Sequence, residues 1–594
     1  MTDRDFDRNQ LNYARYVREA LIPFQERYKH VPKRDPERPN GPIRVGILGG
    51  GAAGLYTGLL LNTVNANLGQ EVFVFDILEA NPDRLGGRLW SQSIGNNPDP
   101  NDYIDVGAMR FPAIPIMDRT FKLFDKLGIT VDNKKTRIPY IMTKKQNLNF
   151  FNGEILTNAA IEASAAAGNP DPFATGQLRK LPEQEVNDAL QIFIQLFSNP
   201  ANFKDAWTKL MDVDQVSMRT YLQSIPNGYD QAQINTLESF ESGTNFYDSA
   251  LSEMVMEWMT FHWPAPKEVP WWTVQGGSSV IVEKMNTALF PPNTQTTSSL
   301  QMGTAVTAIS PTVAPDGSWT SVTVDVTKVN GPSASNTYDH VVSTLPFGCL
   351  RSVDTSKCNF DWEHLQAIRS LQYANSVKVG IRFKKKWWEE LDKPQKGGVS
   401  STDRPTRMII YPSYGIEGSG TTMLVSYSWG QDANRLGALC QGNSSDEEMR
   451  LVNLIMRDLA DIHGITDFDT FSQLYDSHFA WNWDMNQFSC GAFALFGPGQ
   501  FKSLYPNVTA SYGGRLHFAG EATSVHHAWL VGALNSAFRA VYQILHSVGM
   551  EDQLDNLMTE WGKDEEFDPN LYKRQLQIGH HRPILRQNRE RASS

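Results

Sequence analysis

The stretch IRVGILGGGAAGLYTG, residues 43–58, indicates the fold of the chain. Its first six residues are a compact apolar run, which predicts a buried β-strand. Gly49, Gly51 and Gly54 then form the pattern G-x-G-x-x-G, Gly58 extends it, and the apolar residues that follow predict a helix. Glycines at this spacing allow a tight turn and a close approach of the backbone to a pyrophosphate, which the helix N-terminus can bind. The stretch therefore predicts a Rossmann-like dinucleotide site.

An acidic residue at the end of the next strand supports this prediction. VFVFDILEA, residues 72–80, predicts the second strand, and Glu79 lies near its end. A carboxylate roughly 20 residues beyond the glycines accepts hydrogen bonds from the adenosine ribose. Asp76 is a rival for this role, but it lies inside the strand. The pattern to this point fits either NAD or FAD.

Length, composition and charge limit the class of protein. The chain has 594 residues, 41% of them hydrophobic and 20% charged, which predicts several domains with large cores. The net charge of −11 argues against a nucleic-acid partner. The four cysteines lie far apart without a C-x-x-C pair, so we expect neither a disulfide framework nor a metal site.

The N-terminal sequence and the apolar runs bear on location. MTDRDFDRNQ is charged and resembles no signal peptide, and no apolar run is long enough to span a membrane. We expect a soluble protein that is cytoplasmic or otherwise intracellular. Secretion stays open if a leader was removed before the numbering begins.

The remaining chain alternates between strand-like and helical patterns. Residues from about 155 to 265 have apolar residues at helical spacing, and 300–345 reads as strands with a hairpin signal at Asp316-Gly317. VKVGIRF, RMIIYP and TTMLVSYSW predict further strands, and a helix is expected after Ser445 as its N-cap. RLHFAGEATS and a helix to about 548 form the last strong unit. The tail after residue 565 is polar and charged, and we expect it to be poorly ordered.

Two further motifs give the chain a family resemblance. Arg84, Gly86, Gly87 and Arg88 form R-x-G-G-R soon after Glu79, and FAGEATS with Glu521 lies near the C-terminus. In this order the motifs resemble those of the flavin-containing amine oxidoreductases over nearly the whole chain. The resemblance implies FAD as the cofactor. It places these residues along FAD: Gly49, Gly51, Ala53, Gly54, Glu79, Ala80, Arg88, Met109, Arg110, Val306, Trp483, Glu521, Trp529 and Leu530.

The resemblance also implies how FAD is held and how it is reoxidised. Arg88 would contact the phosphates, Glu521 the ribityl or pyrophosphate region, and the Val306 backbone the adenine. Ala492 stands where monoamine oxidases have a flavin-linked cysteine, and Cys490 is two residues away, so we expect non-covalent FAD. No second G-x-G-x-x-G is present for a nicotinamide nucleotide, which favours O2 as the oxidant.

The expected fold class combines α/β with α+β. It comprises a Rossmann-like FAD-binding domain built from discontinuous segments, a mixed-sheet substrate domain and a helical insert. The expected segments are an N-terminal arm (1–42), the FAD-binding domain (43–92, 269–350, 505–548), the substrate domain (93–150, 351–504), the helical domain (151–268) and a C-terminal tail (549–594).

The stretch DVGAMRFP, residues 105–112, places Arg110 in an apolar run. A buried guanidinium needs an anionic partner, which is either an internal Asp or Glu or a ligand carboxylate, unless the side chain reaches the surface. Its G-x-M-R arrangement resembles that of L-amino-acid oxidases, in which this arginine binds the substrate α-carboxylate. The resemblance also assigns Tyr411, in RMIIYP, to the same carboxylate.

The same resemblance assigns the rest of the substrate site. Lys378, alone in an apolar strand, would hold a water against flavin N5 and stabilise the anion formed as O2 is reduced. Trp483 and Trp529 would line the substrate side of the flavin, and Phe493 would lie near the substrate side chain. Ala528 replaces a glycine whose carbonyl receives the substrate amine. His526 and His527 have no assigned role, and a structural one is the default.

The resemblance therefore implies oxidative deamination of L-amino acids to 2-oxo acids, with ammonia and H2O2 released and hydride passing from the α-carbon to flavin N5. Lys378, Arg110, Tyr411 and Trp529 are the expected catalytic residues. An amino-acid 2-monooxygenase and a polyamine or monoamine oxidase are the alternatives within the family. A non-catalytic FAD-bearing interaction protein is the alternative of another class. Assembly as a homodimer or higher homo-oligomer is expected from the family only.

Overall fold

The computed structural model describes residues 41–132, 135–198, 209–262, 268–329, 331–442, 445–562 and 569–593. The predicted N-terminal arm lies outside these ranges except for its last two residues. Within the described ranges, no helix is long and apolar enough to cross a membrane. The same residues contain no group of three or more His, Cys, Asp or Glu side chains placed to hold a metal ion.

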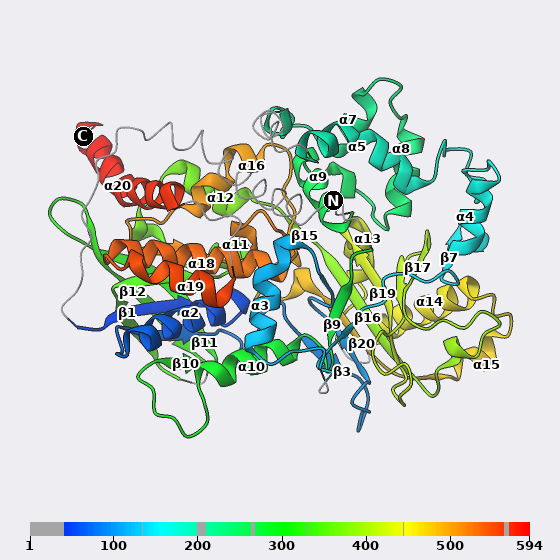
Figure 1. The fold of residues 1–594 in the computed structure, drawn as a ribbon, viewed down its shortest axis with the longest axis horizontal. Helices are drawn as coiled ribbons and strands as arrows, with labels where there is room; N and C mark the ends of the chain where they lie inside the picture. Colours follow the sequence, from blue (N-terminus) through cyan, green and yellow to red (C-terminus); the bar gives the residue numbers. More distant parts are fainter. Residues whose placement is uncertain are drawn as a thin grey trace.

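A five-stranded parallel sheet forms the first half of the molecule (Figure 1). Its strand order is β10 (Ser299–Gln301), β2 (Phe73–Leu78), β1 (Ile43–Leu48), β14 (His340–Ser343) and β22 (Leu516–Phe518). Helices α2 (Ala52–Leu68), α10 (Ser279–Leu289) and α18 (Leu530–Ser547) pack with it, and α2 contacts both of the others. The two predicted strands and the helix after the glycines are confirmed. Strand β1 pairs with β2 on one side and with β14 on the other, so the order of the strands reverses at β1. Ligands of such sheets bind beyond the carboxyl ends of the strands at this reversal, so a ligand site is expected beyond the end of β1.

A three-stranded antiparallel sheet stands beside the parallel one. It contains β11 (Thr304–Val313), β12 (Trp319–Lys328) and β13 (Ser333–Tyr338). The hairpin predicted at Asp316-Gly317 is confirmed, because β11 and β12 pair across it and Gly317 has φ +87°. A positive φ is readily available to glycine.

A seven-stranded mixed sheet forms the second half. Its order is β20 (Tyr475–Asn482), β16 (Ser376–Phe383), β19 (Thr422–Trp429), β18 (Met408–Ile410), β17 (Val399–Thr402), β7 (Leu148–Phe151) and β8 (Glu154–Thr157). Helix α14 (Asp446–Ile462) contacts β19 and β7. The predicted N-cap is confirmed, since Ser445 Oγ accepts a hydrogen bond from the Glu448 N–H.

A small antiparallel sheet connects the two halves. It contains β5 (Phe111–Pro112), β9 (Trp271–Val274) and β6 (Arg137–Pro139). Strand β9 therefore pairs with the segment 93–150, although the predicted boundary at residue 269 places it in the FAD-binding domain. The other predicted domain boundaries stay predictions.

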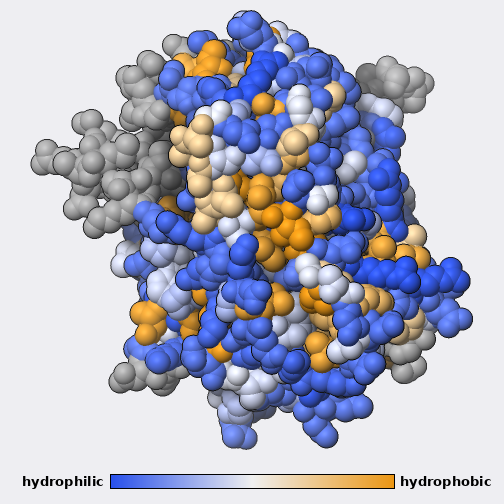
Figure 2. Space-filling view, turned by 90° about the vertical axis from the view of Figure 1, so that its right-hand side faces the viewer, coloured by the Kyte–Doolittle hydropathy of each residue, from blue (hydrophilic) through white to orange (hydrophobic). Residues whose placement is uncertain are grey.

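The segment expected to be helical contains five helices longer than one turn in its described part. They are α4 (Asn158–Ala166), α5 (Pro182–Ser198), α7 (Met218–Ser224), α8 (Gln231–Phe240) and α9 (Leu251–Phe261). The side of the molecule that carries α4 and α14 is largely hydrophilic, with its hydrophobic side chains in separate groups (Figure 2).

Further helices and strands lie along the chain between these elements and after α18. They are β3 (Ser91–Ser93), β4 (Tyr103–Asp105), α3 (Asp118–Lys126), α11 (Phe347–Leu350), α12 (Trp362–Ser370), β15 (Tyr373–Ala374), α13 (Gly430–Gly437), α15 (Phe468–Ser472), β21 (Phe493–Ala494), α16 (Gln500–Ser503), α17 (Tyr505–Thr509) and α19 (Leu554–Trp561).

The prediction of a poorly ordered tail is wrong for its described part. Residues Pro569–Ser593 form helix α20, which packs on α18 (Figure 1). Tyr572 and Ile578 are buried, and Arg582 forms a two-pronged ion pair with Asp361 at 2.5 Å for each contact. The tail is polar overall, but the apolar residues Tyr572 and Ile578 and the charged Arg582 are buried against the body.

Candidate active site

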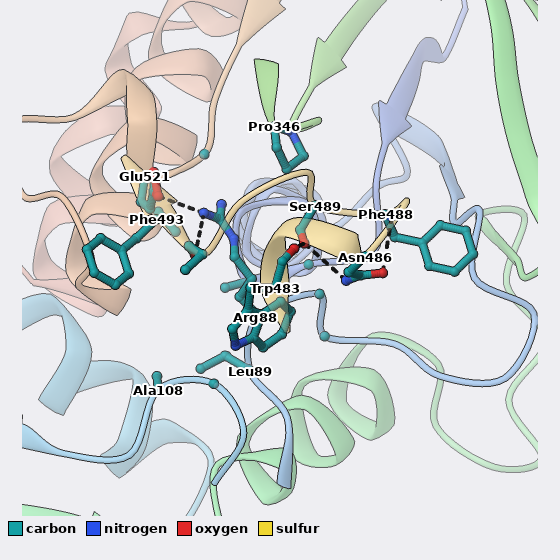
Figure 3. A pocket seen from close by; sticks show the side chains of 18 of the residues that line it. Arg88, Leu89, Ala108, Pro346, Trp483, Asn486, Phe488, Ser489, Phe493 and Glu521 are labelled. Carbon is teal, nitrogen blue, oxygen red and sulfur yellow. Dashed lines mark hydrogen bonds and ion pairs between the residues drawn. The ribbon is translucent and has the colours of Figure 1, made fainter. Parts of the chain in front are cut away.

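One cavity of about 400 Å³ lies between the two large sheets. It is lined by the turn after β1, the end of β2, residues 84–89 and 106–111, strands β16 and β19, and the N-terminal end of α18. Helix α9 of the helical segment contributes a further wall. The cavity thus joins segments from all three predicted domains, and Figure 3 shows part of its lining.

The glycine turn forms one end of the cavity. A Cβ atom at Gly54 would lie 2.0 Å from the Gly49 carbonyl oxygen, so this position requires glycine. Helix α2 begins after Gly51 without a side-chain cap, which leaves its first N–H groups free to bind a phosphate. Glu79 accepts hydrogen bonds from the Gly50 and Asn81 N–H groups, both at 2.7 Å. Burial raises the pKa of Glu79, while these two N–H groups lower it.

Arg88 and Glu521 both line the cavity and point toward each other, as Figure 3 shows. Their ion pair measures 2.7 Å, and Arg88 also donates to the Ala492 carbonyl at 3.1 Å. Burial is the largest single influence on the pKa of Arg88 and lowers it, but Glu521, Tyr373 and Cys349 together raise this pKa above its ordinary value. Glu521 Oε1 accepts a second bond from the Ala494 N–H, whereas its Oε2 is buried with no hydrogen-bond partner. A buried carboxylate oxygen without a partner is costly, so it indicates a missing donor such as a cofactor hydroxyl.

This half of the cavity fits an adenine dinucleotide. The glycine turn and the start of α2 suit the pyrophosphate, Glu79 suits a ribose, and Arg88 supplies positive charge. The other positions that the sequence assigned to the cofactor also line the cavity: Ala53, Ala80, Met109, Val306 and Leu530.

Arg110 lies at the other end, directly before β5. Its guanidinium is 5.0 Å from the Phe261 ring and 5.8 Å from the Trp271 ring, and it donates to Met142 Sδ at 3.6 Å. Among the described residues no Asp or Glu forms an ion pair with it. An arginine on a cavity wall in aromatic surroundings can bind a carboxylate through two parallel hydrogen bonds.

Lys378 is buried on β16 and also lines the cavity. Its Nζ donates to the carbonyl oxygens of Asp105 at 2.9 Å and Gly107 at 2.7 Å. Burial lowers the pKa of Lys378 to about 7, although the Asp105 carboxylate opposes this shift. Tyr427 is its cross-strand partner on β19, and Nζ lies 4.6 Å from the Tyr427 ring.

The structure does not bring Tyr411 to the cavity, which corrects the predicted carboxylate contact. Its side chain is fully buried, and its hydroxyl bonds to Ser400 Oγ at 3.0 Å and His463 Nε2 at 2.7 Å. Successive residues of an extended chain face opposite sides, and it is Ile410 that packs with Met109 and the cavity-side cluster. The tyrosine on the cavity wall is Tyr427.

The predicted aromatic residues do line the cavity. Trp483 donates from Nε1 to the Val106 carbonyl at 3.1 Å, and the Trp529 ring lies 5.5 Å from that of Phe261. Phe493 and Ala528 line it as well. Ala528 has φ +64°, a left-handed conformation that favours glycine. The backbone therefore keeps a glycine-like shape at this position although the residue is alanine.

Sequence reasoning missed the acidic residues of α9. Glu257 lines the cavity, and burial and the neighbouring Glu253 raise its pKa to about 8, although Arg110 lowers it. Glu253 pairs with His527 Nδ1 at 3.0 Å, which gives that histidine a structural role. The neighbouring His526 is also buried, which lowers its pKa to about 3. Two glutamates four residues apart in an apolar helical segment were the available signal, because they share one helix face.

The fold and this cavity define a dinucleotide-binding protein with an aromatic-lined pocket beside the dinucleotide site. The model of the flavin containing amine oxidoreductase family matches residues 52–545, and the chain belongs to that family. Its cofactor is FAD.

Individual relatives agree with this assignment. A putative bifunctional amine oxidase from Dictyostelium discoideum is 36% identical over 93% of this chain, which spans about half (51%) of that relative. L-amino-acid oxidase 4 from Hebeloma cylindrosporum is also 36% identical, over 90% of this chain and 86% of its own length. Cyclohexylamine oxidase from Brevibacterium oxydans has the same fold, with a TM-score of 0.60 at 15% identity, and the match covers 86% of this chain and 100% of that one.

Proposed function

We propose that this protein oxidises L-amino acids to 2-oxo acids, releasing ammonia and reducing O2 to H2O2. The observation that carries the proposal is Arg110, a guanidinium on the cavity wall with no acidic ion-pair partner among the described residues. Amines without a carboxylate offer nothing that would offset the cost of this charge. The relatives named L-amino-acid oxidase support the same reading.

The residues of the chain bind and orient the substrate. Arg110 holds the α-carboxylate, and the Ala528 carbonyl accepts a hydrogen bond from the amine. Phe261, Trp271 and Trp529 pack around these groups and exclude water. Fixed geometry of this kind supplies much of the rate of such a reaction. Bound FAD supplies the acceptor for the α-hydrogen, which leaves as hydride, and passes the electrons to O2.

Two titratable groups on the cavity wall complete the proposal. The substrate amine must be neutral to form an imine, and Glu257 is the carboxylate that takes the ammonium proton. Arg110 and His527 both act on the charge of Glu257, so the carboxylate lies in the same part of the cavity. Lys378, when protonated, stabilises the negative charge that develops on O2.

Product analysis tests this function. Purified protein is incubated with single L-amino acids, and the 2-oxo acid, ammonia and H2O2 are quantified. The proposal predicts equal amounts of all three. An amide with one carbon fewer would show a 2-monooxygenase instead, and an aldehyde formed only from amines would show an amine oxidase.

A further inference from the structure

Two cysteines from distant parts of the sequence meet beside the cavity, and one of them, Cys349, lines it. Cys349 lies in α11, and Cys490 lies a few residues after the short helix η6 (Trp483–Met485). Their Sγ atoms are 3.9 Å apart, and both thiols donate to the Gln487 carbonyl, at 3.6 and 3.9 Å. Figure 3 shows Pro346, which precedes α11, next to the turn that carries Ser489. The proposed reaction uses neither thiol.

The backbone holds Cys490 close to α11. A Cβ atom at Gly348 would lie 2.6 Å from Cβ of Cys490, so only glycine leaves room for this approach. Cys490 itself has φ +49°, a conformation that a residue with a side chain rarely adopts. Such a conformation persists only where the surroundings fix it. The pairing of the two thiols is therefore built into the local structure.

The two thiols differ in access. Cys490 is exposed, whereas Cys349 is partly buried. Burial raises the pKa of Cys349, and the adjacent Cys490 raises it further. The thiolate is the reactive form of cysteine, so the exposed Cys490 meets an oxidant first and Cys349 is placed to react second.

We propose that Cys349 and Cys490 form a reversible disulfide when the protein meets hydrogen peroxide. Peroxide first converts the Cys490 thiol to a sulfenic acid and leaves as one water. The Cys349 sulfur then attacks the sulfenic sulfur, the S–S bond forms, and the hydroxyl departs with the thiol proton as a second water. The sulfur atoms must approach by about 2 Å, within reach of side-chain rotation and a small shift of the turn. The bond would tie α11 to the turn that lines the cavity.

Peptide mapping of the full-length, FAD-loaded protein tests this proposal. The protein is treated with H2O2 without any amino acid, alkylated, digested without reductant and analysed by mass spectrometry. We expect a Cys349–Cys490 cross-linked peptide that lacks two hydrogens and disappears on treatment with dithiothreitol. Cys358, which is buried, and Cys440, which is partly buried, serve as internal references. Both should escape oxidation and be recovered as alkylated peptides. Because peroxide is added, the outcome does not depend on the proposed function.

Single substitutions separate a pair from independent thiols. In Cys349→Ser, Cys490 should stop at the sulfenic acid and be trapped by dimedone, while Cys440→Ser should form the cross-link as the wild type does. Cys490→Ser should leave Cys349 unmodified, which keeps the test informative if Cys349→Ser does not fold. The proposal is overturned if no cross-link forms, or if Cys440 oxidises within about tenfold of the rate of Cys490.

Discussion

Substitution of Lys378 by methionine should affect both the stability of the fold and the reaction of the reduced protein with O2. The first concerns stability, since Lys378 Nζ donates to the carbonyls of Asp105 and Gly107. Methionine fills similar space but leaves both acceptors without this donor. Each hydrogen bond from a charged group contributes about 1.5–3 kcal/mol, so the loss of both should lower the free energy of unfolding of Lys378→Met by roughly 3–6 kcal/mol.

The second consequence concerns the reaction with O2. As an order of magnitude, a unit charge that acts over about 6 Å at an effective dielectric constant of about 20 contributes about 3 kcal/mol. This corresponds to roughly a hundredfold in rate. The assay is stopped-flow reoxidation of the substrate-reduced protein by O2. We expect Lys378→Met to lower the second-order rate constant about a hundredfold while anaerobic reduction by the amino acid changes little.

The pH dependence follows from the lowered pKa of Lys378. With a pKa of about 7, the ammonium is charged below neutral pH and loses its charge above it. The reoxidation rate of the wild type should therefore fall as the pH rises from about 6 to about 9, and that of Lys378→Met should be flat.

A matched lysine controls for the loss of an ammonium group. Lys386 Nζ donates to the carbonyls of Gly415, Ile416 and Gly418, away from the cavity. Lys386→Met should leave the reoxidation rate and its pH profile unchanged. The role of the Lys378 charge is refuted if Lys378→Met reacts with O2 within about threefold of the wild type, or if the wild-type rate does not change with pH.

Three further predictions concern other parts of the chain. The pKa of Glu257 is about 8, so the anaerobic reduction rate of the wild type should rise as the pH passes this value, and Glu257→Gln should remove that rise. Glu241→Gln is the control and should retain the rise, because Glu241 is a partly buried carboxyl of the helical segment whose pKa is raised to about 7. An unaltered profile in Glu257→Gln would exclude the proton-acceptor role. Ala528→Gly should raise the free energy of unfolding by about 1 kcal/mol, because glycine adopts the left-handed conformation of this position without the strain that a Cβ atom causes. Turnover should stay within threefold of the wild type, and a lower thermal stability would contradict this prediction. Arg582→Ala should cost about 3–5 kcal/mol in thermal unfolding and make α20 sensitive to protease, because it leaves Asp361 without its buried partner. Lys573→Ala, which breaks an exposed ion pair, should cost less than about 1 kcal/mol, and equal effects would contradict the tail docking.

The cofactor half of the site could be read from the sequence because its determinants are local. The glycines, Glu79, Arg88 and Glu521 lie in short motifs whose backbone requirements depend on few neighbours, such as the Gly54 contact with the Gly49 carbonyl. The tail helix could not be read in this way, since its stability depends on Asp361, more than two hundred residues away.

The substrate half depended more on strand register and on long-range pairing. Tyr411 and Ile410 are neighbours in the sequence, and only the orientation of the extended chain decides which side chain faces the cavity. Tyr427 reaches the site because it pairs with Lys378 across two strands, a register that one sequence does not show. Glu257 arrives on a helix of the inserted segment, whose position against the two sheets is a property of the whole fold.

The central claim is that Arg110 selects substrates with an α-carboxylate. The most direct measurement is anaerobic bleaching of the bound flavin by matched sets of L-amino acids, D-amino acids and the decarboxylated amines, on wild type and Arg110→Ala. Arg137→Ala is the matched control, because Arg137 also lies over aromatic rings but pairs with Asp125 outside the cavity. We predict that L-amino acids alone bleach the wild type and that Arg110→Ala weakens their apparent binding by about 2–5 kcal/mol, while Arg137→Ala does not. Equal bleaching by the amines and indifference to Arg110→Ala would contradict the account and make the protein an amine oxidase.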